Sequence, residues 1–331
     1  MRTLVVAPGW VGDAVMAEPV FRALEASGRA LTVVAKRPLQ PLLALFPGVA
    51  GAIERGAGDA ETAARIAAER FDEAIVLPNS FRSAKLVRDA GIPRRWGYRG
   101  DWRAPLLAPA VGRPRGRRPQ IEDYRELLAA IGVTAPDDWL PRLALPEELV
   151  ARGRERLSRA HLEAGAQPIV GLFPGAEWGP SKRWPMMSFA ELSRELRRRA
   201  PGARQAIVAG PKEVWLAVRV YEESGKLHPV VGPELDLAAL AGVVAHFDVL
   251  VTNDSGPMHL AAALGVRCVA LFGPTDPRRT APAGPGHEVI YRDLWCSPCF
   301  RRHCPLVHHR CLRGIGVADV AAAVERALAG G

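Results

Sequence analysis

The alternation of strand and helix is clearest in residues 249–272, VLVTNDSGPMHLAAALGVRCVALF. Val249–Thr252 is a short apolar run of the kind that forms a buried strand, and Val269–Phe272 is another. Gly256–Leu264 lies between them with the length of a helix, and Pro257 suits its first turn. Two strands joined by a helix form a parallel βαβ unit. The link from the first strand into the helix should therefore lie at the carboxyl edge of a sheet, where such folds bind ligands.

The same alternation runs through the chain in two series. In the first half we predict strands at Leu4–Ala7, Leu31–Ala35 and Ala74–Leu77, with helices at Ala14–Ala26, Pro38–Leu45 and Ala60–Glu69. In the second half we predict strands at Ile169–Phe173, Ala206–Ala209, Val249–Thr252 and Val269–Phe272, with helices at Ser188–Arg199, Glu213–Glu223, Leu237–Ala245 and Gly256–Leu264. The pattern is typical of an α/β protein with two open parallel sheets, each covered by helices on both faces.

A stretch with several prolines, 134–146, separates the two series. We therefore expect two Rossmann-like domains, 1–146 and 147–331, which suits a chain of 331 residues. A helix near Glu147–Ala164 leads into the second domain, and the last helix, Val317–Ala329, is expected to pack back on the first. Two such domains facing each other would place the ligand site in a central cleft between them.

Composition and charge exclude several classes of protein. No stretch reaches the roughly 18 to 20 apolar residues of a membrane-spanning helix, and the start of the chain is too short and too polar for a secretory signal. The formal net charge is +9. A basic protein attracts nucleic acid, anionic membranes or phosphorylated substrates, and other features of the sequence must decide among them.

The segment after the first strand, APGWVGD, ends at a candidate catalytic carboxylate, Asp13. Gly9 and Gly12 allow a tight turn that delivers Asp13 to the first turn of a helix. A purely structural role, as the capping residue of that helix, remains an alternative. A dehydrogenase is disfavoured because the segment lacks G-x-G-x-x-G and because Lys36, not an acidic residue, follows the second strand.

Two further strand-end segments predict an anion site in the second domain. FPGAEWGPSKRWP, residues 173–185, combines exposed glycine amides with Lys182, which suits phosphate, although a solvated basic loop is the alternative. In the segment from residue 251, Asp254 is expected to cap the helix, and Ser255 and Gly256 offer amides to an anion. His259 lies about one turn into that helix and could donate to a diphosphate oxygen, although a lone histidine is more often structural.

These segments carry a resemblance to a known family. PGAEWGPSKRWP, TNDSGPMHLAAALGV and LFGPTDP are spaced as in the heptosyltransferases of glycosyltransferase family 9. The resemblance implies a GT-B fold, with an acceptor on the first domain and ADP-heptose mainly on the second. It also implies an inverting transfer that needs no metal.

The resemblance further implies roles for individual residues. Asp13 matches the catalytic base, Lys182 the diphosphate-binding lysine, and Glu213 an acidic residue that holds the ribose hydroxyls. The full set implied for the donor is Gly12, Gly175, Ala176, Lys182, Glu213, Asp254, Ser255, Gly256 and His259.

The acceptor and the reaction are also inferred from the resemblance. The phosphate loop lacks the paired threonines of the type I enzymes, which favours the type II branch. That branch transfers heptose from ADP-L-glycero-D-manno-heptose to the first heptose of the lipopolysaccharide inner core, in heptosyl-Kdo2-lipid A. A type I-like transferase acting on Kdo2-lipid A, a GT-B sugar-nucleotide epimerase and a non-catalytic sugar-nucleotide-binding protein remain alternatives.

A basic segment follows in the first domain. Between Arg94 and Arg118 eight arginines accompany a single acidic residue, Asp101. A solvated loop is one interpretation, and nucleic acid is disfavoured because no known binding motif accompanies the charge. The resemblance points instead to an acceptor with carboxylates and phosphates. We assign the binding of these groups to Arg94, Arg95 and Arg99. The same charge would hold a cytoplasmic enzyme peripherally on the inner face of the inner membrane.

Four of the five cysteines cluster near the carboxyl end, with the spacing C-x2-C-x4-C-x6-C. Cys296, Cys299, Cys304 and Cys311 could hold a structural zinc ion. Reduced thiols and disulfides remain the alternatives, and disulfides are disfavoured in a reducing cytosol.

Overall fold

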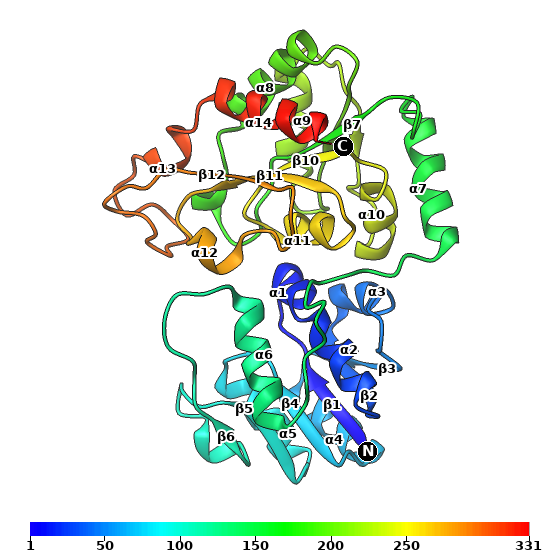
Figure 1. Ribbon diagram of the computed structural model, residues 1–331, viewed down its shortest axis with the longest axis vertical. Helices are drawn as coiled ribbons and strands as arrows, with labels where there is room; N and C mark the ends of the chain where they lie inside the picture. The colour runs from blue at the N-terminus through cyan, green and yellow to red at the C-terminus, as the bar shows by residue number, and fades with distance from the viewer. Residues whose placement is uncertain (331) are drawn as a thin grey trace. The chain divides into compact units, whose positions relative to one another are not determined.

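The computed structural model describes residues 1–330. The chain forms two compact units, Met1–Ala144 and Leu145–Gly331, and Gly331, the last residue of the second predicted domain, lies outside the described residues. Each unit contains one six-stranded sheet with helices packed against it (Figure 1). The predicted α/β class, with two parallel sheets, is confirmed.

The sheet of the first unit has the strand order β3-β2-β1-β4-β5-β6, with parallel pairing throughout. Its strands are β1 Arg2–Val6, β2 Ala30–Lys36, β3 Gly51–Arg55, β4 Glu73–Val76, β5 Arg94–Tyr98 and β6 Ala110–Val111. Its helices are α1 Val11–Met16, α2 Glu18–Ala26, η1 Arg37–Leu39, α3 Gln40–Leu43, α4 Asp59–Glu69, α5 Phe81–Asp89, η2 Ala104–Leu106 and α6 Gln120–Ile131.

The sheet of the second unit has the equivalent order β12-β11-β10-β7-β8-β9, again parallel. Its strands are β7 Ile169–Phe173, β8 Arg204–Val208, β9 Val230–Val231, β10 Val249–Asn253, β11 Arg267–Phe272 and β12 Glu288–Tyr291. Its helices are α7 Glu147–Arg159, η3 Pro180–Lys182, α8 Met186–Arg199, α9 Val214–Glu223, α10 Leu237–Val244, α11 Gly256–Ala263, α12 Pro277–Thr280, α13 Arg310–Arg313 and α14 Val317–Ala329.

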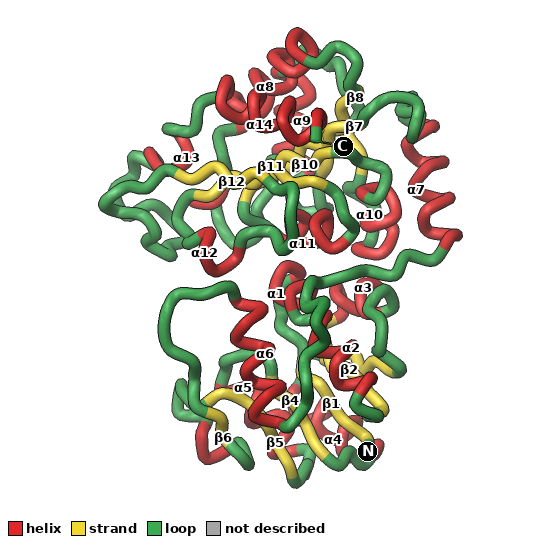
Figure 2. The backbone as a smooth tube through the Cα atoms, in the orientation of Figure 1, coloured by secondary structure: helices red, strands yellow, loops and turns green. Residues whose placement is uncertain are grey.

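Both sheets reverse their strand order once, and this reversal positions the candidate site. In the first unit the chain proceeds from β1 to β2 and β3, then returns to β4 on the other side of β1. In the second unit it proceeds from β7 to β8 and β9, then returns to β10 beside β7 (Figure 2). Connections after the two central strands leave the sheet on opposite faces, so a crevice forms at their carboxyl ends. The segments after β1, β7 and β10 all lie at such a point.

The core of the second unit explains why its central strands are so apolar. Every residue of β7 and β10 is buried, as expected for parallel strands covered on both faces. The last helix packs against α8 and the strands β10, β11 and β12 of its own unit, and its expected return to the first domain stays a prediction. Its buried side chains, among them Val320 and Val324, belong to the same hydrophobic cluster as Leu172 and Val251.

One predicted helix is divided in the structure. The expected helix Ala14–Ala26 separates into α1 and α2 at Ala17. Pro19 lies in the first turn of α2, where its missing N–H costs nothing because the first amides of a helix have no partner within it. In the part of the chain that the structure describes, no helix is long and apolar enough to cross a bilayer.

Candidate functional site

The carboxylate of Asp13 is positioned by two helices of the first unit. Helix α1 begins at Val11 with Trp10 as its N-cap, so Asp13 is the third helical residue and the capping alternative is wrong. Its Oδ1 accepts a hydrogen bond from Gln120 Nε2 at 3.1 Å. Gln120 is the first residue of α6 and also donates to the Tyr124 hydroxyl at 3.0 Å. Sequence reasoning missed Gln120, which orients the half-buried Asp13; Gly12, beside it, is buried.

An ammonium and a carboxylate meet at the switch point of the second sheet. Lys182, at the end of η3 after β7, places its Nζ 2.6 Å from Oδ2 of Asp254, which follows β10. The Thr275 hydroxyl, from the segment after β11, donates to the same oxygen at 2.5 Å. Three strand-end segments therefore converge on Asp254. The expectation that Asp254 caps α11 is wrong, because Ser255 is the N-cap.

The buried side chain of Asn253 connects β10 to the loop after β7 by hydrogen bonds. Its Nδ2 donates to the carbonyl oxygens of Pro174 and Gly175 at 2.9 and 3.1 Å. Its Oδ1 accepts from the Trp184 backbone N–H at 2.9 Å. One side chain at the end of β10 therefore anchors both ends of the loop after β7. Sequence reasoning missed Asn253, although a polar residue at the end of an apolar strand is a recognisable signal.

Glu213 lies beneath the same loop. It is buried at 6% exposure, and its Oε1 accepts from the Ala176 N–H at 2.7 Å and from Arg183 Nη2 at 3.3 Å. Burial raises the pKa of Glu213, and these two donors oppose the rise. Gly175 is required here, because a Cβ at that position would lie 2.1 Å from Glu213 Oε2. The loop backbone and the carboxylate are therefore closely fitted.

The amino terminus of α11 adds backbone donors beside the lysine. Ser255 is the N-cap and Gly256 the first helical residue, so the first amides of the helix point outward without partners inside it. His259 is buried on the same helix. Burial lowers the pKa of His259 to about 4; Asp254 opposes this change, and Lys182 reinforces it. His259 is therefore neutral near pH 7 and can offer one N–H.

The loop after β7 is also hydrogen-bonded to the cysteine-containing segment of the same unit. Ser181 donates from its hydroxyl to the Arg301 carbonyl at 2.5 Å and from its N–H to the Arg302 carbonyl at 3.2 Å. The Trp178 ring lies 5.1 Å from Lys182 Nζ, a cation–π distance that helps to place the ammonium. Sequence reasoning did not identify either contact.

The structure separates the three arginines assigned to the acceptor. Arg94 and Arg95 begin β5, and the register pairs Arg94 with Glu73, the first residue of β4. They therefore lie at the amino edge of the sheet, opposite the ligand-binding edge. The Arg95 guanidinium is also engaged, since it donates to backbone carbonyls of Ile92, Pro93 and Leu106. This placement does not favour a role for Arg94 and Arg95 in acceptor binding, and the assignment of all three arginines, including the exposed Arg99 after β5, stays a prediction.

The cysteine cluster surrounds one small cavity. All five cysteines are free thiols, so the disulfide alternative is not realised. A cavity of about 20 Å³ is lined by Cys296, Cys299, Cys304, Cys311, His308 and His309, among others. Cys296 Sγ lies 4.0 Å from His308 Nε2. Within residues 1–330, however, no three or more His, Cys, Asp or Glu side chains are arranged to hold a metal ion, and the zinc ligand set stays a prediction.

Comparisons with known proteins identify the family. Glycosyltransferase family 9 (heptosyltransferase) matches residues 60–309. Lipopolysaccharide heptosyltransferase 2 of Escherichia coli K12 is 34% identical over 310 residues, covering 88% of each chain, and that of Salmonella typhimurium is 34% identical over 308 residues with the same coverage.

Solved structures give the same result. The structure of E. coli ADP-heptose LPS heptosyltransferase II matches with a TM-score of 0.83 at 30% identity, covering 100% of this chain and 99% of that one. This likeness confirms the predicted GT-B fold class. The chain belongs to glycosyltransferase family 9, the heptosyltransferase family, and is a glycosyltransferase.

Proposed function

We propose that this enzyme transfers heptose from ADP-L-glycero-D-manno-heptose to the first heptose of the lipopolysaccharide inner core. The observation that carries the proposal is the convergence of Lys182, Asp254 and the amino terminus of α11 at the switch point of β7 and β10. A cation beside unpartnered helix amides suits a diphosphate. The relatives named heptosyltransferase 2, matched over 88% of each chain, support the choice of donor and acceptor.

The donor half of the site would stabilise the leaving group. As the glycosidic bond breaks, negative charge develops on ADP, and preorganised positive groups lower the barrier by interacting most strongly at that stage. Lys182 would bind the diphosphate as a point charge, the Ser255 and Gly256 amides would donate to it, and neutral His259 would donate one N–H. We propose that these groups carry out the transfer without a metal ion.

The nucleoside would be held by the loop after β7. Both observed contacts of Glu213 use Oε1, so we assign Oε2 to the ribose hydroxyls. Gly175 and Ala176 would lie along the nucleotide, because Gly175 brings the backbone against Glu213 and Ala176 donates to it. Asn253 would act indirectly, by fixing this loop to β10.

Asp13 would be the general base. It would accept the proton of the acceptor hydroxyl as that oxygen attacks the anomeric carbon. Gln120, which donates to Asp13 Oδ1 at 3.1 Å, would orient the carboxylate. Attack opposite the departing ADP inverts the anomeric centre. In this proposal one unit supplies the base and the other supplies the donor-binding groups.

Release of ADP tests the reaction and its acceptor together. The purified enzyme is incubated with ADP-heptose and heptosyl-Kdo2-lipid A, with Kdo2-lipid A, or with no acceptor. Release that requires heptosyl-Kdo2-lipid A supports the proposal. Release that requires Kdo2-lipid A would replace it by a type I-like reaction, and conversion of the donor without any acceptor would indicate an epimerase.

We further propose that the enzyme works in the cytoplasm, bound peripherally to the inner membrane. Its net charge of +9 suits an anionic leaflet, where each nearby basic residue contributes about 1 kcal/mol. Sedimentation with vesicles containing anionic lipid should exceed sedimentation with neutral vesicles and should decline with salt. Equal sedimentation with both would remove the electrostatic basis of this location.

A further inference from the structure

A second, strongly basic site lies in the first unit and is separate from the residues considered so far. A pocket of about 360 Å³ opens at the carboxyl ends of β2 and β3 and the start of α5. It is lined by Lys36, Arg37, Pro38, Glu54, Arg55, Gly56, Ala57 and Arg82. Four of these side chains are cationic and one is acidic. The pocket thus occupies the edge at which parallel sheets bind ligands.

The strand register brings two of the cations together. Lys36, the last residue of β2, is paired with Arg55, the last residue of β3. Paired residues of neighbouring parallel strands project from the same face of a sheet, about 5 Å apart. The Lys36 ammonium also reaches the turn after β1, because a Cβ on Gly9 would lie 3.2 Å from its Nζ. The pocket therefore adjoins the segment that leads to Asp13.

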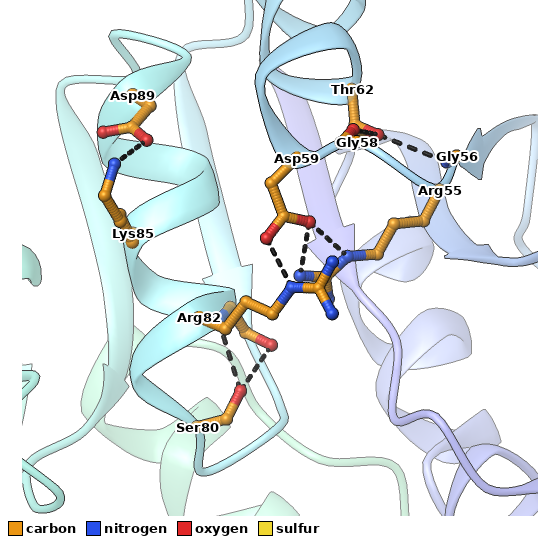
Figure 3. Close-up of polar contacts among 10 residues, drawn as sticks. Arg55, Gly56, Gly58, Asp59, Thr62, Ser80, Arg82, Lys85 and Asp89 are labelled. Atoms are coloured by element: carbon orange, nitrogen blue, oxygen red, sulfur yellow. Dashed lines mark hydrogen bonds and ion pairs between the residues drawn. The ribbon is translucent and has the colours of Figure 1, made fainter.

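Two of the arginines are held in place by Asp59 (Figure 3). Its Oδ1 accepts from Arg55 at 3.0 and 3.2 Å, and its Oδ2 accepts from Arg82 Nε. The hydrogen bond from Arg82, followed by that from Arg55, lowers the pKa of Asp59, which burial alone would raise. The carboxylate is ionised at neutral pH and fixes both guanidinium groups at the pocket wall.

The other two cations have no such partner. Neither Lys36 nor Arg37 forms an ion pair or a side-chain hydrogen bond within residues 1–330. Two unpaired cations beside two fixed guanidinium groups leave the pocket with an excess of positive charge. Both are exposed, so an incoming anion can reach them with little desolvation of buried charge.

We propose that this pocket binds an anionic group of the acceptor, a sugar carboxylate or a phosphate. The inference rests on the proposed function, because it identifies where the acceptor of that reaction is held. Arginine forks and lysine are the side chains that bind such oxyanions, and about 360 Å³ accommodates a charged sugar residue. The pocket takes the role that the sequence suggested for Arg94 and Arg95.

The test neutralises the two unpaired cations. Lys36→Gln, Arg37→Gln and the double variant are compared with Lys85→Gln, which removes one charge from the exposed face of α5, where Lys85 pairs with Asp89 outside the pocket. The acceptor KM should rise about tenfold or more in the double variant, the effect of losing charge-assisted hydrogen bonds. The KM for ADP-heptose and the kcat at saturating acceptor should stay within about twofold, and Lys85→Gln should match wild type.

An acceptor KM of the double variant equal to that of Lys85→Gln would overturn the proposal. Two acceptors distinguish the source of the anion: heptosyl-Kdo2 oligosaccharide, which keeps the carboxylates, and heptosyl-Kdo2-lipid A, which adds phosphates. A rise with both acceptors identifies a carboxylate, and a rise only with the lipid identifies a phosphate.

Failure of the proposed function has a different signature. Wild-type enzyme would then release no ADP with any acceptor. Binding to the pocket can still be measured without turnover, by calorimetric titration with the heptosyl-Kdo2 oligosaccharide and with phosphorylated lipid A in detergent micelles. Binding that weakens in the double variant but not in Lys85→Gln supports an anion site. Affinity equal in all three proteins, or no binding by wild type, overturns it.

Discussion

The ammonium of Lys182 lies 2.6 Å from Oδ2 of Asp254, and both side chains are largely buried, at 14% and 5% exposure. The pair joins the segments that follow β7 and β10, so the cation is placed before any substrate arrives. Its charge is balanced by one carboxylate that the Thr275 hydroxyl also contacts. A diphosphate with more charge than one carboxylate can compete for the same ammonium. If these residues bind the donor as proposed, the ammonium is already in place before binding.

Replacing Lys182 by Met should therefore reduce turnover more than donor binding. Removal of one preorganised donor to developing negative charge costs about 10²–10³ in kcat. Lys182→Met should show a loss of this size, and Lys182→Arg a smaller one because the positive charge is kept. Steady-state kinetics of ADP release measure both variants, with Lys226→Gln, at an exposed lysine, as the control. A kcat of Lys182→Met within threefold of wild type would contradict this role.

Asp13→Asn should abolish base catalysis while sparing the donor. General-base contributions are typically 10²–10⁴-fold, so kcat should decrease by that factor while the Kd for ADP is unchanged. The amide can still accept the hydrogen bond from Gln120, which keeps the local geometry. Gln120→Ala should decrease kcat less, because the carboxylate remains and only its orientation is lost. Equal losses in the two variants would mean that Asp13 acts through structure.

The deeply buried strands were predictable from sequence, and the peripheral elements were not. β7 has the predicted bounds, Ile169–Phe173, because a strand covered on both faces is a continuous apolar run. β3, Gly51–Arg55, was missed because it is an edge strand with only Ile53 deeply buried. Helix α5 was missed for a related reason, since five of its nine residues are exposed and four of those five are charged.

The residues of the candidate site that were predictable are those marked by a local sequence pattern. Asp13, Lys182 and Asp254 stand at strand ends in short glycine-containing segments, which sequence alone shows. Gln120 contacts Asp13, 107 positions away in the sequence, and Asn253 contacts Pro174, 79 positions away. Contacts over such separations depend on the tertiary fold. The basic pocket has the same origin, because the pairing of β2 with β3 brings Lys36 beside Arg55.

His259 should make the stability of the second unit dependent on pH. Its pKa is lowered from 6.5 to about 4, chiefly by burial. As the pH falls through 6.5, the unfolded chain binds a proton that the folded chain does not. The contribution of neutral His259 to the free energy of unfolding is therefore fully present above pH 6.5 and is lost as the pH falls toward 4. The loss approaches about 3 kcal/mol, at 1.36 kcal/mol for each pKa unit.

Urea unfolding of wild type and His259→Asn between pH 7.5 and 4.5 measures this effect. The free energy of unfolding should decrease more steeply with acidification in wild type than in the variant. His228, whose pKa burial also lowers to about 4, and Glu213, whose pKa burial raises, are present in both proteins and cancel in the difference. Parallel pH profiles would show that His259 does not have the lowered pKa.

A close contact between α7 and α10 should be intolerant of a single methyl group. A Cβ on Gly153 would lie 2.1 Å from the Gly242 carbonyl oxygen, and a Cβ on Gly242 would lie 2.4 Å from the Leu149 carbonyl oxygen. Backbone atoms cannot rotate away as a side chain can, so Gly153→Ala must separate the helices. Overpacking of this kind typically costs 1–3 kcal/mol, which outweighs the gain of about 0.5–1 kcal/mol from alanine's helix propensity. Thermal unfolding should show a lowered Tm for Gly153→Ala but not for Gly202→Ala, whose Cβ would meet no atom within 4 Å. A Gly153→Ala variant as stable as Gly202→Ala would show that the two helices are not packed this closely.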